Sequence, residues 1–97
     1  MHARLTTFSL RPGTRAEAEL IADRFSQLLC EQPGHRHSTF YFTEGGDQLG
    51  SFSVWDSREQ AEAATLSVGT AAQEALGDLL EGTWIVQIME VFRDSQA

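Results

Sequence analysis

The sequence RHSTFYFTEGGDQLGSFSVWD, residues 36–56, predicts two strands joined by a tight turn. Residues 36–43 and 48–56 have the short, turn-bounded pattern of strands. Between them, residues 44–47, EGGD, have the composition of a hairpin turn, because glycine adopts the positive φ angles that such turns require. The centre of the chain is therefore expected to form an antiparallel β-hairpin.

A helix is expected on each side of this hairpin. Residues 14–31 begin with TRAE, which has capping-box spacing, and then place their apolar residues on one helical face. Residues 57–66 begin with a second capping box, SREQ, and continue as an alanine-rich helix. SVG at 67–69 is expected to interrupt this helix, so that a further short helix capped by TAAQ covers 70–82.

Two further strands complete the pattern. HARLTTFSL, residues 2–10, and TWIVQIMEVF, residues 83–92, are both predicted to be strands. The resulting order, βαββαβ, is ferredoxin-like, an α+β fold with a four-stranded antiparallel sheet. The 97 residues suffice for one hydrophobic core only, so residues 1–97 are expected to form a single domain with a loose tail at 94–97.

Both faces of the predicted sheet carry apolar residues, although the helices can cover only one of them. In the last strand, Ile85 and Met89 belong to one alternate set and Val86 and Ile88 to the other. The sequence alone does not assign either set to the helices. Because an uncovered apolar face usually marks a partner surface, we expect a homodimer formed through the sheet face opposite the helices.

Composition argues against several classes of partner and cofactor. Seven arginines, no lysine and fourteen acidic residues give a net charge of −7, which opposes binding to nucleic acid or to an anionic membrane surface. No apolar run approaches a signal peptide or the roughly 20 residues of a membrane span, so a cytoplasmic location is expected. Cys30 is the single cysteine, and neither a metal-ligand cluster nor a dinucleotide-binding loop is recognisable, so no cofactor is expected.

The chain resembles the antibiotic biosynthesis monooxygenase family, part of the dimeric α+β barrel superfamily. The resemblance spans nearly the whole sequence and rests on LRPG at 10–13, QPG at 32–34, SVWDS at 53–57 and MEVF at 89–92. It implies that two sheets pack face to face into a barrel with the helices outside. Each protomer then has its own pocket between sheet and helices.

By this resemblance the chain is expected to be a cofactor-independent monooxygenase acting on a phenolic or polycyclic aromatic molecule. In such enzymes the deprotonated substrate passes an electron to O₂, while the protein supplies an apolar pocket, a proton acceptor and hydrogen bonds to the anion. Two positions depart from the polyketide oxygenases, since Ala61 replaces their tyrosine and Ser51 their asparagine. The alternative is therefore a non-catalytic dimer that binds a small molecule or has a structural role.

Trp55 is the leading candidate for a catalytic residue, because it matches the tryptophan that ends the third strand in those oxygenases. Strand alternation places Ser51 and Ser53 on the same face as Trp55, which leaves room for a bound substrate beside the indole. The indole offers a stacking surface and one N–H donor to an oxyanion. The alternative is a structural Trp55 in the core, with its N–H bonded to a carbonyl.

The candidate proton acceptor is His37, since imidazole titrates near neutral pH, or a water molecule. His37 is predicted to share one strand face with His35, and the alternative is a pair of surface histidines at the start of a strand. Tyr41 and Thr6 are further substrate-binding candidates. Thr6 stands where haem-degrading members of the superfamily have an asparagine, and none of the functional residues of that branch is present.

Arg4 and Glu90 lie inside otherwise apolar strands that are neighbours in a ferredoxin-like sheet. A buried charge needs a partner, so an ion pair between these two residues is expected. The alternative is that the charge holds a substrate anion.

Overall fold

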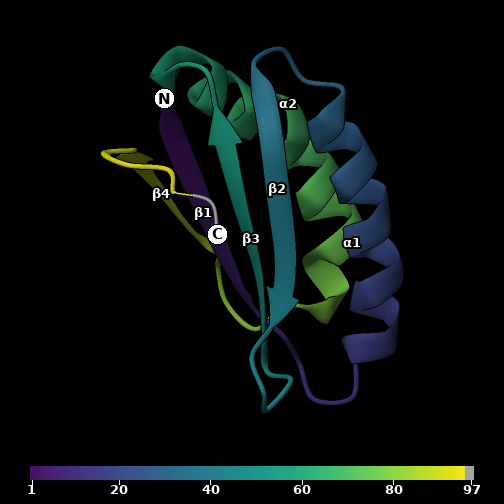
Figure 1. Ribbon diagram of the computed structural model, residues 1–97. Coiled ribbons are helices and arrows are strands. Elements are labelled where there is room, and N and C mark those ends of the chain that lie inside the picture. Colours follow the sequence, from purple (N-terminus) through teal and green to yellow (C-terminus); the bar gives the residue numbers. More distant parts are fainter. Residues whose placement is uncertain (96–97) are drawn as a thin grey trace.

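The computed structural model describes residues 1–95 as two helices packed on one four-stranded sheet (Figure 1). The elements in chain order are β1 (His2–Ser9), α1 (Arg15–Cys30), β2 (His35–Phe42), β3 (Gln48–Trp55), α2 (Arg58–Leu76), the 3-10 turn η1 (Gly77–Leu79) and β4 (Ile85–Glu90). This order confirms the predicted βαββαβ fold of the α+β class. Residues 91–95 contain no helix or strand, and residues 96–97 of the expected loose tail lie outside the described residues.

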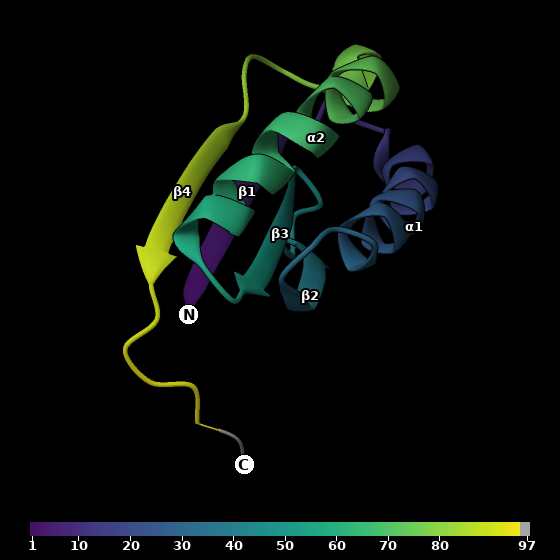
Figure 2. The ribbon, with the colours of Figure 1, turned by 90° about the horizontal axis from the view of Figure 1, so that it is seen from above.

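The strands are antiparallel and lie in the order β2-β3-β1-β4. β1 is central and pairs with β3 on one side and β4 on the other. Helices α1 and α2 lie on the same face of this sheet, termed here the helix-facing side (Figure 2). No helix of the described residues covers the opposite face, termed the open face.

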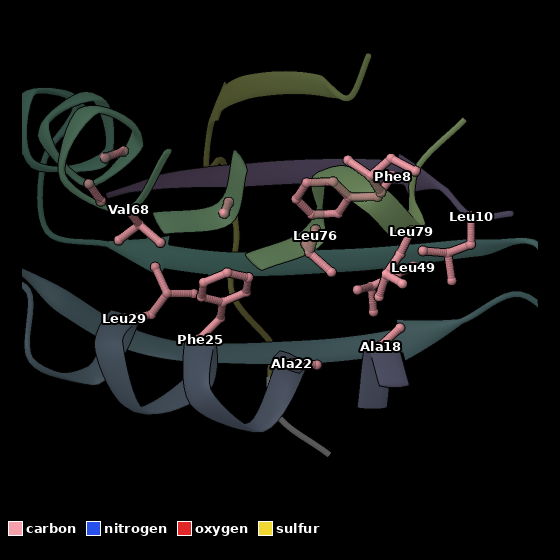
Figure 3. Close-up of a cluster of buried hydrophobic side chains, with 14 of the residues drawn as sticks. Phe8, Leu10, Ala18, Ala22, Phe25, Leu29, Leu49, Val68, Leu76 and Leu79 are labelled. Atoms are coloured by element: carbon pink, nitrogen blue, oxygen red, sulfur yellow. The ribbon is translucent and has the colours of Figure 1, made fainter. Parts of the chain in front are cut away.

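The hydrophobic core fills the space between the helix-facing side and the two helices (Figure 3). Helix α1 contributes Phe25 and Leu29, and helix α2 contributes Leu76. From the sheet, Phe8 of β1 lies opposite Leu49 of β3, and both are buried in this core. Because strand residues alternate between faces, the even-numbered residues of β1 and the odd-numbered residues of β3 point toward the helices.

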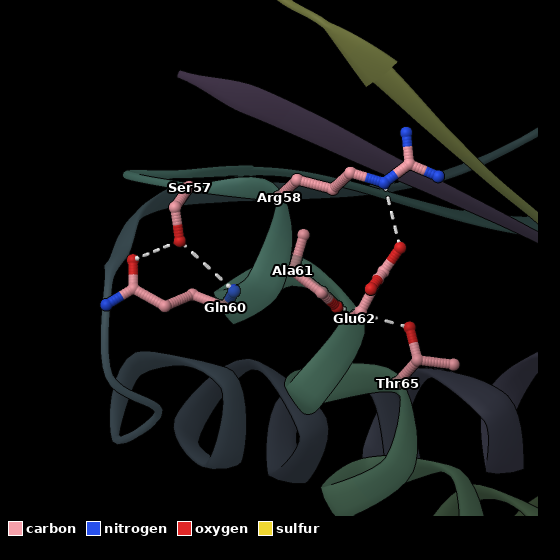
Figure 4. A network of polar contacts seen from close by, with 6 residues as sticks. All are labelled: Ser57, Arg58, Gln60, Ala61, Glu62 and Thr65. Atoms are coloured by element: carbon pink, nitrogen blue, oxygen red, sulfur yellow. Dashed lines mark hydrogen bonds and ion pairs between the residues drawn. The ribbon is translucent and has the colours of Figure 1, made fainter.

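Helix α2 runs unbroken from Arg58 to Leu76, so the interruption predicted at 67–69 and the separate helix over 70–82 are wrong. Val68 is 7 % exposed within the core, and its burial favours a continuous helix. That burial outweighs the roughly 1 kcal/mol that a glycine costs in a helix interior. The start of α2 is as predicted: the Ser57 hydroxyl accepts the backbone N–H of Gln60 at 3.2 Å (Figure 4).

Two other local predictions differ from the structure. The Thr14 side chain does not cap α1, because its hydroxyl instead donates to the carbonyl oxygen of Arg11 at 2.7 Å. The last strand is shorter than expected, since it begins only at Ile85. Trp84, just before it, packs its ring against Phe8 with centroids 5.4 Å apart.

The open face of the sheet carries apolar side chains from several strands. Leu5 of β1 lies directly opposite Phe52 of β3, and both are half-buried. The register of β4 assigns Ile85 and Met89 to the same face, where they are 63 % and 36 % exposed. Ile88 points to the helix-facing side and packs against the core. The structure thus identifies which alternate set of the last strand is uncovered.

Candidate functional site

A cavity of about 90 Å³ lies between the helix-facing side of the sheet and the two helices. Phe25 and Leu29 of α1 contribute to its apolar wall. The central strands add three polar side chains, Arg4 and Thr6 from β1 and Ser51 from β3. The cavity therefore combines an apolar body with a polar patch supplied by the sheet.

Arg4 is a buried cation in this cavity wall. The residue is 6 % exposed, and its Nε donates a hydrogen bond of 2.7 Å to Oγ1 of Thr65 on α2. Thr65 is itself held in place, because its hydroxyl donates to the carbonyl oxygen of Ala61 at 3.2 Å (Figure 4). Burial lowers the pKa of the Arg4 guanidinium, since desolvation disfavours the charged form.

The predicted ion pair between Arg4 and Glu90 does not form. Arg4 lies opposite Ile88 in the register of β1 and β4, whereas Glu90 lies opposite His2 and is exposed. No carboxylate within residues 1–95 comes within ion-pair distance of the Arg4 guanidinium. A buried charge without a counterion destabilises the fold by several kcal/mol. This position therefore lowers the stability of the isolated chain.

Thr6 and Ser51 are a directly opposed pair across β1 and β3. They are 2 % and 4 % exposed, and neither hydroxyl has a hydrogen-bond partner within the described part of the chain. An unsatisfied buried hydroxyl costs about 1–3 kcal/mol. Because both residues line the cavity, these hydroxyls are available to a molecule inside it.

Trp55 points toward the helices, as the strand pattern predicts, but it does not line the cavity. It is fully buried, and its Nε1 donates a 2.9 Å hydrogen bond to Oγ of Ser53. Ser53 in turn donates a longer bond of 3.4 Å to the carbonyl oxygen of Arg4 and also lies outside the cavity wall. Of the three residues expected to share one wall, only Ser51 lines the cavity.

A β-bulge at Arg36 separates His35 from His37. His35 lies opposite Trp55 and His37 opposite Val54, so the two histidines occupy opposite faces and not the same face as predicted. The His35 ring meets the indole edge-on, with centroids 5.2 Å apart. Burial lowers the pKa of His35, and the nearby positive charge of His37 lowers it further.

His37 and Tyr41 both lie on the open face, away from the cavity. His37 is exposed, and Tyr41 is 40 % exposed with its ring over Gly50, where a Cβ would collide with it. Among the described residues, Arg4 is the only ionisable side chain in the cavity wall. The cavity thus favours an anion and does not place a protein base beside one.

Gly69 is a cavity residue that the sequence analysis interpreted as a helix break. Thr65, Val68, Gly69 and Ala72 all line the cavity, and their spacing places them on one face of α2. A Cβ added at Gly69 would meet no atom within 4 Å, so the space beside it is open. The sequence feature that could have indicated this cavity position is the occurrence of a glycine within an otherwise continuous helical pattern.

Two findings concern metals and membranes. Within residues 1–95, His, Cys, Asp and Glu side chains do not gather in groups of three that could hold a metal ion. None of the described helices combines the length and the hydropathy needed to cross a membrane.

Several solved structures share this fold over nearly the whole chain. Rv0793 of Mycobacterium tuberculosis has a TM-score of 0.81 at 20 % identity, with 98 % of each chain covered. SnoaB of Streptomyces nogalater, a cofactor-independent oxygenase, has a TM-score of 0.78 at 19 % identity, covering 96 % of this chain and 94 % of its own. A Deinococcus radiodurans protein, provisionally described as an antibiotic biosynthesis monooxygenase, has a TM-score of 0.83 at 15 % identity, covering 100 % and 98 %.

No protein-family model and no curated protein sequence matches the chain. The resemblance to antibiotic biosynthesis monooxygenases is confirmed at the level of the fold, because structures of that description superpose on nearly every residue. At identities of 20 % and below, the likeness concerns the fold alone.

Proposed function

We propose that this protein is a cofactor-independent monooxygenase of single-ring phenols, with the cavity between sheet and helices as its active site. The carrying observation is the mixed cavity wall, in which the buried cation Arg4 and the unpartnered hydroxyls of Thr6 and Ser51 adjoin an apolar body. SnoaB, a cofactor-independent oxygenase, has the same fold, which supports this kind of activity.

The cavity wall favours the anionic form of a phenol. A phenolate beside Arg4 gains charge-assisted hydrogen bonds, which lower the pKa of the phenol, so its proton passes to water without a protein base. The phenolate then reduces O₂ directly. Overall, phenol and O₂ give a quinone and water. One oxygen atom forms a bond to a ring carbon, and the other leaves as water with the hydroxyl hydrogen and that carbon's hydrogen.

The cavity volume favours a phenolic over a polycyclic substrate. Its 90 Å³ is below the roughly 150 Å³ that accommodates benzene in an engineered protein cavity, so even one ring requires a wall side chain to move. Trp84 is placed to do so, because it is only partly buried and also lines a neighbouring pocket of about 220 Å³. A fused polycyclic body exceeds this volume further.

The proposal includes a homodimer in which two open faces meet, forming the α+β barrel, with each chain contributing one domain. Leu5 and Phe52 occupy the middle of that face, and Ile85 and Met89 extend it across β4. Covering these side chains with the same face of a second copy removes apolar surface from water. The cavities would then lie outside the interface, one in each protomer.

The second candidate function is binding of a small molecule without catalysis. Two observations favour it: the Trp55 N–H is already engaged by Ser53, and no base among the described residues lines the cavity. A binding protein needs the polar patch and the apolar wall but no proton acceptor.

The test of the function is oxygen consumption. Purified protein is mixed with a panel of single-ring phenols and hydroquinones, and O₂ uptake is recorded with an electrode while quinone absorbance is followed. We expect one O₂ consumed for each quinone formed, at a rate unchanged by a metal chelator. Elemental analysis of the same sample is expected to find no stoichiometric transition metal. Binding of these molecules without O₂ uptake would favour the second candidate function.

Replacing Trp55 by phenylalanine tests whether the indole takes part in chemistry. Because its N–H is bonded to Ser53 within the core, we expect the change to lower the free energy of unfolding by about 1–3 kcal/mol. Turnover per folded molecule should be unchanged. The measurements are urea unfolding and O₂ uptake on the same samples. A turnover loss of about 10²–10³, typical for a lost oxyanion donor, would instead assign Trp55 to catalysis.

A further inference from the structure

We infer that Arg4, Thr6 and Ser51 together form an oxyanion-binding subsite, and that the molecule it takes is a single-ring organic anion. The inference deepens the proposed function, on which it rests for the choice of cavity. It concerns binding and can be measured without turnover. Carboxylates and phenolates share the required chemistry, a charged oxygen attached to one ring.

The backbone places the three donors on one patch. Arg4 and Thr6 are two residues apart on β1, so their side chains leave the same face of the sheet roughly 7 Å apart. Ser51 lies opposite Thr6 on the neighbouring strand, about 5 Å away at the backbone. All three line the same cavity, so an oxygen group of carboxylate size can be reached from two strands at once.

The donor set selects for negative charge. The Arg4 guanidinium has donors only, and the two hydroxyls are free to donate because they have no partner within residues 1–95. An anionic oxygen can accept from all three and supplies the counterion that Arg4 lacks among the described residues. A neutral ligand would leave that buried charge uncompensated, and a cation would be repelled.

The rest of the wall selects for a ring. Phe25, Leu29 and Phe40 line the same cavity and offer only apolar contact. An inorganic anion would satisfy the three donors but leave this apolar surface uncovered. A flat ring attached to the charged oxygen group covers it, and the small volume limits the ligand to a single ring.

Calorimetric titration with two probes of nearly the same shape tests the subsite. Benzoate carries the charged oxygens, and benzamide is its neutral counterpart. We expect wild-type protein to bind benzoate at least about tenfold more tightly than benzamide, since hydrogen bonds between charged groups are the stronger ones. Sodium phosphate is the inorganic anion for comparison, and we expect it to compete only weakly with benzoate. Equal binding of benzoate and benzamide, or binding of neither, would overturn the inference.

Single substitutions test whether these residues are responsible for benzoate binding. Arg4→Met should weaken benzoate binding by about tenfold to a hundredfold and leave benzamide binding unchanged. Ser51→Ala, which removes one hydroxyl with little change of volume, should weaken benzoate binding by about tenfold. The matched control is Arg36→Met, because Arg36 is an exposed arginine that pairs with Asp56 at the surface. It should bind benzoate like the wild type.

The results of these binding and turnover measurements distinguish the anion-binding subsite from the proposed monooxygenase activity. Arg4→Met is expected to fold, because it removes an unpaired buried charge, and its melting temperature without ligand should rise. Selective benzoate binding without O₂ uptake would support the subsite and contradict the monooxygenase. Phenol turnover that Arg4→Met and Ser51→Ala leave unchanged would contradict the subsite and would show that oxygenation takes place without this polar patch.

Discussion

Replacing Phe52 by aspartate is expected to convert the proposed dimer into folded monomers. Phe52 lies in the middle of the open face, opposite Leu5, where the proposed interface would bury it. A buried, unpaired carboxylate costs at least about 3 kcal/mol, and two-fold symmetry places one in each copy. Together these terms should raise the dissociation constant by about 10⁴-fold, which light scattering at micromolar concentration detects as a halved mass.

A matched control separates this effect from a general loss of apolar surface. Leu20 is 70 % exposed on α1, a helix on the far side of the sheet from the open face. Leu20→Asp introduces the same charge and should remain dimeric. Phe52→Asp protein that is folded by circular dichroism and still dimeric would rule out the open face as the interface. A wild-type monomer would rule out the dimer itself.

The sequence was sufficient for the order of elements because the relevant signals are local. Strand alternation, the hairpin turn at 44–47 and the Ser57 cap each depend on residues close together in the chain. The length of α2 was not predictable in this way, since Gly69 is a local helix breaker and the burial of Val68, Ala72 and Leu76 in the core overrides it. Tertiary packing therefore decided what propensity alone could not.

The candidate site was predictable only in part, because the sequence pattern gives neither the strand register at a bulge nor the depth at which a side chain is buried. Ser51, Ser53 and Trp55 were correctly placed on the same face, because period-two alternation fixes a residue's face. The bulge at Arg36, which moves His37 to the other face, leaves no signal in the pattern. Alternation also gives no information on how deeply a residue is buried. The sequence pattern therefore could not distinguish a Trp55 packed in the core from a Trp55 lining the cavity.

Several residues that reduce stability line one cavity of this fold. The buried ring nitrogens His2 Nδ1 and His35 Nε2 also lack partners among residues 1–95, but they lie outside that cavity. Arg4 is a buried charge without a carboxylate partner among residues 1–95, and Thr6 and Ser51 have hydroxyls without partners in the same range. Gly69 occupies a helix interior although there is room for a side chain. All four line the same cavity. Departures from local consistency that cluster in this way are typical of functional sites, where stability is given up for binding or catalysis.

Substitutions that fill the space beside Gly69 should therefore affect stability and ligand binding differently. Gly69→Ala is expected to raise the free energy of unfolding by about 0.5–1 kcal/mol, because alanine is the better helix former and its Cβ meets no atom within 4 Å. Gly69→Leu should extend into the cavity and abolish benzoate binding and phenol turnover together. Urea unfolding and calorimetric titration on each variant measure the two effects.

Ser67→Leu is the matched control, because Ser67 is exposed on the same helix two residues earlier. It adds the same side chain to α2 without entering the cavity and should bind benzoate like the wild type. Gly69→Leu protein that is folded and binds benzoate normally would show that ligands bind elsewhere, the open face with His37 and Tyr41 being the next surface to test. Loss of binding in Gly69→Leu but not in Ser67→Leu places the ligand against α2, where Thr65 holds the Arg4 guanidinium.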